Sequence, residues 1–82
     1  MERPYDIYHN GYLSTICLPH DLAEEFIDFS AERHQHVVLS FDTMHTFIGF
    51  PDLAIPQVSA LFDEFSTIRQ AALHSSMEAG AI

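Results

Sequence analysis

The chain has 82 residues, 48% of them hydrophobic, and carries 12 Asp and Glu against 3 Lys and Arg, which gives a formal net charge of −9. So acidic a chain is not expected to bind nucleic acid or anionic membranes, because phosphates and acidic headgroups repel it. The apolar content argues against disorder, and no stretch reaches the roughly 20 apolar residues that span a bilayer. With no leader-like segment and one cysteine, Cys17, the sequence predicts a single cytoplasmic domain over residues 1–82.

The first expected elements are strands over residues 5–9 and 12–18, joined at Asn10-Gly11. Asn-Gly between alternating apolar residues is the strongest short hairpin signal, because both residues tolerate the positive φ of a type I′ turn. The implied register pairs His9 with Tyr12, Ile7 with Ser14 and Tyr5 with Ile16.

A helix is expected to follow, starting near Asp21. Asp21 and Glu24 have the spacing of a capping box, in which side chains at the first turn satisfy free backbone N–H groups. The expected buried face carries Leu22, Phe26 and Phe29 at helical spacing, followed by Arg33 near the helix end.

The second half of the chain repeats this order, with strands over 37–42 and 44–50 and a helix from Pro56 to about Met77. The turn at Asp42-Thr43 is weaker than Asn-Gly, because a β-branched Thr resists positive φ. The implied register pairs Phe41 with Met44, Leu39 with Thr46 and Val37 with Ile48, and the apolar stripe of the helix is Val58, Leu61, Phe62, Phe65, Ile68 and Ala72.

The two halves are also alike in sequence, since FIDFSAER at 26–33 matches FDEFSTIR at 62–69. We interpret them as an internal ββα repeat, with repeat one at about 5–34 and repeat two at about 37–77. The predicted fold class is α+β, with a four-stranded antiparallel sheet, two helices on one face and a pseudo-two-fold axis. The Phe pairs, three residues apart on each helix, are expected to pack in the core rather than to form a surface Phe-x-x-Phe motif.

The residues paired in the two registers, Ile16 and Ile48 among them, are predicted to face the helices together with Leu18 and Phe50, and the opposite sheet face is predicted to be half apolar. An exposed apolar face of this kind suggests a partner or a second copy of the chain, or else a half-hydrated sheet. The candidate contact residues are Tyr8, Leu13, Val38 and Phe47.

Catalytic and metal chemistry find little support in the sequence. His34, His36 and His45, with Cys17, could form a small metal-binding or catalytic site, but no second Cys, HExxH or glycine-rich phosphate loop accompanies them. We therefore predict no enzyme, no metal and no cofactor, and keep a histidine-based metal site as an alternative.

The acidic residues form the most suggestive pattern, a row of carboxylates on the outer faces of the two helices. Such a row can substitute for a phosphate backbone in the basic groove of a nucleic-acid-binding protein. In size, charge and lack of catalytic motifs the chain resembles small acidic inhibitors made by phages, including anti-CRISPR proteins. The alternatives are a structural or regulatory homodimer, such as an adaptor or immunity protein, and acidity that serves solubility alone. The candidate residues are Asp21, Glu24, Glu25, Asp28, Glu32, Asp63 and Glu64.

Overall fold

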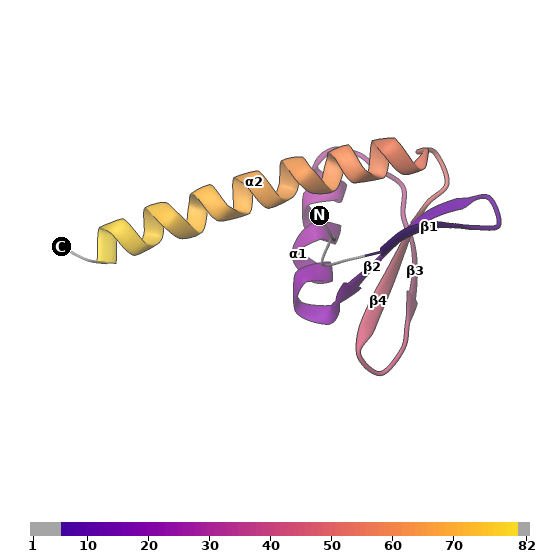
Figure 1. The fold of residues 1–82 in the computed structure, drawn as a ribbon, viewed down its shortest axis with the longest axis horizontal. Helices are drawn as coiled ribbons and strands as arrows, with labels where there is room; N and C mark the ends of the chain where they lie inside the picture. Colours follow the sequence, from indigo (N-terminus) through magenta and orange to yellow (C-terminus); the bar gives the residue numbers. More distant parts are fainter. Residues whose placement is uncertain (1–5, 81–82) are drawn as a thin grey trace.

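The computed structural model describes residues 6–80, and the side chains of residues 6–73. In chain order it contains β1 (Asp6–Asn10), β2 (Leu13–Pro19), α1 (His20–Glu32), β3 (Val38–Phe41), β4 (His45–Phe50) and α2 (Ile55–Gly80). The four strands form one antiparallel sheet in the order β1-β2-β4-β3 (Figure 1). The predicted α+β class and four-stranded antiparallel sheet are confirmed, and the two hairpins meet through their second strands.

The first hairpin pairs two residues away from the predicted register. Asn10 lies opposite Leu13, so the loop is Gly11-Tyr12, and Ile7 lies opposite Ile16 instead of Ser14. Gly11 takes the left-handed conformation with φ +66, which glycine adopts without steric cost. A shift of two residues leaves every side chain on its predicted face. The predicted contact of Tyr5 lies outside the described residues.

The second hairpin is shifted in the same way. Leu39 lies opposite Ile48 and Phe41 opposite Thr46. The Asp42 N–H donates to the His45 carbonyl at 3.0 Å, so the hairpin closes around Thr43-Met44. The Asp42 carboxylate stabilises this turn. Its Oδ1 accepts hydrogen bonds from the Met44 N–H at 2.8 Å and the His45 N–H at 2.6 Å.

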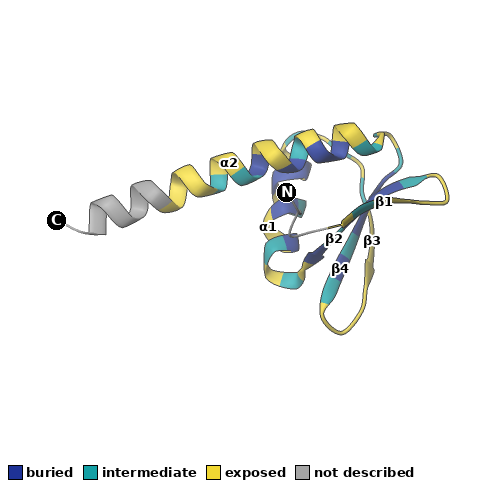
Figure 2. Ribbon diagram, viewed as in Figure 1, coloured by how far each residue is buried: buried dark blue, intermediate teal, exposed yellow. Residues whose placement is uncertain are grey.

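The core lies between the helices and one face of the sheet. Even-numbered residues of β2 and β4, among them Ile16, Leu18, Ile48 and Phe50, are fully buried, and residues of both helices complete the same cluster. Both helices therefore cover one face, as the period-2 alternation of the strands predicted. Figure 2 shows this buried layer on the inner sides of α1 and α2.

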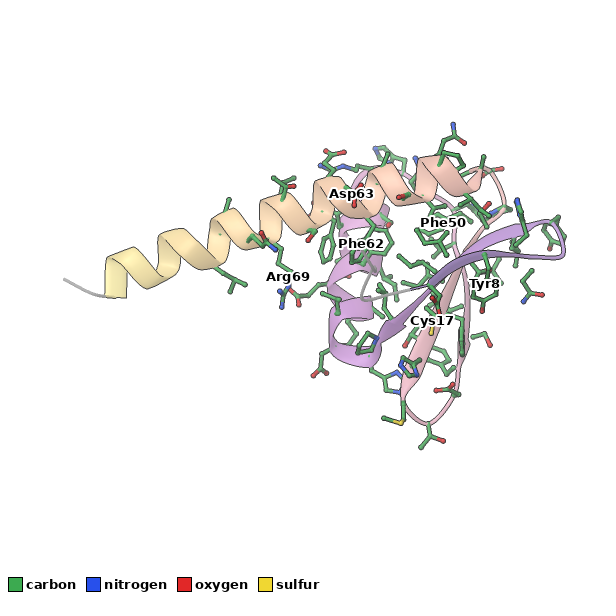
Figure 3. The ribbon with its side chains drawn as sticks, viewed as in Figure 1. Tyr8, Cys17, Phe50, Phe62, Asp63 and Arg69 are labelled. Atoms are coloured by element: carbon green, nitrogen blue, oxygen red, sulfur yellow. The ribbon has the colours of Figure 1, made fainter. Side chains whose placement is uncertain are left out.

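Phe26 is the centre of this core. Its ring centroid lies 5.2 Å from those of Phe62 and Phe65, 6.0 Å from that of Phe50 and 6.3 Å from that of Phe29. In Figure 3 the side chains of Phe50 and Phe62 point into the space between helix and sheet. The prediction that both Phe pairs serve the core is confirmed, because all four rings are buried.

The start of α1 differs from the predicted capping box. The strand β2 runs directly into the helix, so Pro19 occupies the N-cap position and no side chain caps the helix. The Asp21–Glu24 prediction was therefore wrong, because Asp21 already lies inside the first turn, where its charge still suits the helix dipole.

The end of α1 is a Schellman motif. The N–H of Gln35 donates to the Ser30 carbonyl and the N–H of His34 donates to the Ala31 carbonyl, both at 3.0 Å. His34 closes the motif with φ 59, a left-handed backbone conformation that is unfavourable for residues with a Cβ atom.

The helix α2 is much longer than α1. With 26 residues it is roughly 39 Å long, against roughly 20 Å for the 13 residues of α1, so its second half extends beyond the sheet and α1 (Figure 1). It continues past the predicted end at Met77 to Gly80, and Arg69 lies mid-helix rather than near its C-terminus. Within the described residues, no helix is both long and apolar enough to cross a membrane.

We predict that Phe26→Ala lowers the free energy of unfolding by about 3–5 kcal/mol, because it removes the α1 ring that packs against α2 and the sheet and leaves a cavity. Urea denaturation followed by circular dichroism measures the change. Phe47→Ala, a half-buried ring on the opposite sheet face, is the control and should cost clearly less. Equal losses would show that the Phe26 cluster is not the centre of stability.

We also predict that His34→Gly stabilises the protein by roughly 1 kcal/mol, because glycine takes the left-handed C′ position without the Cβ clash. His34→Ala keeps the Cβ and removes the ring, so it is the matched control and should not be stabilising. Thermal denaturation of the three proteins side by side is the measurement.

Candidate protein-interaction surface

The predicted acidic residues all lie on the protein surface. The helix α1 turns Ala23, Phe26, Phe29 and Ser30 into the core, which leaves its acidic positions on the outer side. Each of the following is exposed: Asp21, Glu24, Glu25, Asp28, Glu32, Asp63 and Glu64.

Glu64 and Glu25 are each paired with an arginine of the chain. Arg33 Nη2 lies 2.8 Å from Glu64 Oε1, and Arg69 Nε lies 3.1 Å from Glu25 Oε2, so each arginine links one helix to the other. The Arg33 guanidinium also lies 3.6 Å from the centre of the Phe29 ring. Such partly exposed pairs contribute on the order of 0.2–1 kcal/mol, so they orient the helices more than they stabilise them.

The other α1 carboxylates point to solvent. Asp21, Glu24, Asp28 and Glu32 form no ion pair with any residue whose side chain the structure describes. They recur at intervals of about one helical turn, which spaces them by roughly 5.4 Å along α1. The structure therefore places most of the unengaged acidic surface on α1 rather than equally on both helices.

A groove lies beside this row, between the second half of α1 and the middle of α2. Its volume is about 500 Å³. Phe29, Phe65 and other apolar side chains line it together with carboxylates. The lining residues are Glu25, Asp28, Phe29, Glu32, Phe65, Ile68, Arg69, Ala72 and Leu73.

The sequence did not predict this groove, although the signal for it was present. Ile68 and Ala72 belonged to the predicted buried stripe of the second helix, but both are exposed, and Ile68 retains 49% of its surface. The last members of the stripe lie at the edge of the contact between the two helices, where they line the groove and stay exposed.

The open sheet face brings the four predicted contact residues together. Tyr8 and Val38 are 37% and 44% exposed, whereas Leu13 and Phe47 are half-buried. In the sheet register, Tyr8 lies opposite Thr15, which pairs with Gly49, which in turn pairs with Val38.

The glycine in this row has a packing reason. A Cβ at Gly49 would lie 2.9 Å from Leu13 Cδ1, so the leucine side chain occupies the space above the backbone. This face is thus partly covered by its own side chains.

Cys17 shares this face but is poorly suited to nucleophilic chemistry. Burial raises the pKa of its thiol, and the negative charges of Asp42 and Asp6 add to the increase. The thiolate is the reactive form, so a raised pKa makes the group less reactive. Cys17 lies opposite Phe47 across the sheet. Burial raises the pKa of Tyr8 as well.

The histidines proposed as alternative ligands do not gather into one site. His34 lies in the turn that follows α1, His36 lies in the next loop and His45 begins β4. Among the residues that the structure describes, no group of three or more His, Cys, Asp or Glu is arranged to hold a metal ion.

His20 has a role that the sequence did not reveal. Its Nε2 lies 3.2 Å from the Thr43 carbonyl and so donates to it, and its Nδ1 lies 2.9 Å from Thr46 Oγ1. The ring also lies 6.4 Å from that of Phe41. The first residue of α1 therefore ties the helix to the β3–β4 hairpin, a contact between residues far apart in sequence.

Comparison of the chain with protein-family models, with curated proteins and with solved structures found no match.

We predict an acid-dependent contribution of Asp42 to stability. Hydrogen bonds from the Met44 and His45 N–H groups hold the pKa of this carboxyl below its ordinary value of 3.8. Because the folded-state pKa is lowered, the charged carboxylate stabilises the fold at pH values above 3.8. This stabilisation is lost as the pH falls through the folded-state pKa.

Urea denaturation between about pH 6 and pH 3 tests this, with Asp42→Ala compared with the natural chain. Asp42→Ala should be less stable at neutral pH, and the difference should shrink as the pH falls. Asp42→Asn is the control, because it keeps an acceptor oxygen that does not titrate. A difference between Asp42→Ala and the natural chain that does not change with pH would contradict the predicted role of the charge.

Proposed function

We propose that this chain is a small, acidic, non-enzymatic protein that acts by binding another protein in the cytoplasm. In its most specific form it is an inhibitor that occupies the basic, nucleic-acid-binding surface of its target, as a phage-encoded, anti-CRISPR-like inhibitor of a bacterial defence complex would. The observation that carries the proposal is the row of exposed carboxylates on α1, held on a helix whose opposite side is fixed in the core.

Electrostatics support this function in two ways. A net charge of −9 attracts a basic surface over distance and raises the rate of encounter. A row of carboxylates on a rigid helix then presents negative charge in a fixed order, so little conformational entropy is lost on binding.

We further propose that the two halves are copies of one ββα unit. Alignment of LSTICLP at 13–19 with HTFIGFP at 45–51 makes Ile48 the counterpart of Ile16, Thr46 that of Ser14 and Phe50 that of Leu18. The pairing of β2 with β4 supports the repeat, because Ile16 lies opposite Ile48, and exchanging each residue for its counterpart turns the pair Ser14–Phe50 into Leu18–Thr46. Under this proposal the local two-fold axis passes between Ile16 and Ile48. The acidic row is then a later specialisation of the first copy, since most of its members lie on α1.

A homodimeric adaptor or immunity protein is the second candidate. Tyr8 and Val38, exposed on the open sheet face, favour it, because a second copy could cover them. The net charge opposes it, since two chains of −9 repel each other at low salt.

We predict that an immobilised chain captures a basic, nucleic-acid-binding protein from lysate of the host at low salt and releases it at high salt. Asp21→Asn with Glu24→Gln should slow association with the captured protein by roughly 3- to 10-fold, because steering charges act mainly on the on-rate. The protein should also displace nucleic acid from its target.

The control is Asp6→Asn with Asp52→Asn, which changes the net charge equally at exposed positions off the α1 row. This control should associate nearly as fast as the natural chain. Salt-independent binding, or equal slowing by the two double variants, would contradict a specific role for the α1 carboxylates.

A further inference from the structure

An exposed apolar surface lies where α2 leaves the body of the protein. Ile68 and Leu73 are large apolar residues, yet 49% and 50% of their surface is accessible to solvent. Figure 2 shows α2 changing from buried to exposed along this stretch. Both residues line the groove described above, whose inner wall is formed by Phe29 and Phe65.

The charges around the groove indicate what kind of partner fits it. Glu25, Asp28 and Glu32 project from its α1 side. The cations near the groove are already paired, Arg69 with Glu25 and Arg33, which lies over the Phe29 ring, with Glu64. An acidic occupant would be repelled, and a second copy of this chain is strongly acidic. A segment with apolar residues on one side and Lys or Arg beside them satisfies both parts of the surface.

The walls of the groove also limit the conformation of the occupant. Both walls are helices, whose backbone groups are bonded within the helix and cannot pair with an incoming strand. A helix bonds its backbone groups within itself and so needs no backbone partner from these walls. A third helix can place residues spaced i, i+3 and i+4 into the space between two others.

We propose that the groove between α1 and α2 binds a basic amphipathic helix of the partner protein. The apolar face of that helix packs on Ile68 and Leu73 and reaches only the exposed edges of Phe29 and Phe65. Its Lys or Arg residues lie against Asp28 and Glu32. This deepens the proposed function, on which it rests, because it names the part of the basic target that is recognised. It adds a site distinct from Asp21 and Glu24 at the other end of α1.

The test uses a designed, fluorescently labelled peptide of roughly 18 residues, long enough for about five helical turns. Leu is placed at i, i+3, i+4 and i+7, with Lys on the flanks. A scrambled peptide of the same composition and a peptide with Glu in place of Lys are the controls. Fluorescence anisotropy at low and physiological salt measures binding to the full chain.

We expect the amphipathic Lys peptide to bind, and both control peptides to bind at least about tenfold more weakly. Ile68→Ser with Leu73→Ser should weaken binding about tenfold or more, and Asp28→Asn with Glu32→Gln should weaken it and reduce its salt dependence. All four residues are exposed, so the variants should fold, which circular dichroism checks. The matched control, Leu39→Ser with Phe41→Ser, removes exposed apolar residues on β3 and should leave the affinity unchanged.

Equal binding of the scrambled peptide, or undiminished binding by the Ile68 and Leu73 variant, would overturn the proposal. So would self-association of the chain that this variant abolishes, because the occupant would then be a second copy. The same variants separate the two proposals. If the host target is captured normally by the Ile68 and Leu73 variant, the inhibitor function stands and the groove is not its site.

Discussion

The packing of Phe26 against four other aromatic rings is the contact on which the rest of the structure depends. Its ring touches its helix neighbour Phe29, the strand residue Phe50, and both Phe62 and Phe65 of α2. A chain this short buries a limited core, so one cluster shared by every layer supplies much of its cohesion. It also fixes how α1 is rotated about its axis. With Phe26 inward, the acidic positions of α1 face solvent.

The unequal length of the helices is the second constraint. The Phe cluster anchors the first half of α2 against α1 and the sheet, and the helix then runs on beyond them (Figure 1). The apolar stripe of α2 nevertheless continues to Ile68 and Leu73. A groove with apolar walls and acidic edges results, next to the most acidic helix of the molecule. The binding functions proposed here use both properties, the charge for encounter and the apolar wall for retention.

The sequence predicted those features that local periodicity controls. Alternation in the strands identified Ile16 and Ile48 as core residues, and the spacing of the Phe pairs identified the inner faces of both helices. The acidic positions were correctly placed at the surface for the same reason. Periodicity does not fix register, so both hairpins were predicted with the correct faces but two residues away from the true pairing.

The features that the sequence did not predict depend on contacts between distant residues. The capping box failed because β2 runs into α1 at Pro19 without a loop. The His20 link to Thr43 and Thr46 crosses between elements whose relative position only the folded chain defines. The pairs that Glu25 and Glu64 form with arginines likewise depend on how the two helices cross, and they reduce the free acidic surface that was expected.

The central claim is that the acidic helices and their groove are free to receive a basic partner. Sedimentation equilibrium of the purified chain, at micromolar concentrations and at both low and physiological salt, tests it most directly. A monomer under all these conditions is the predicted result, because the surface that would be covered repels a second copy. A stable dimer that tightens as salt screens the charge would contradict the claim and assign the exposed apolar residues to self-association.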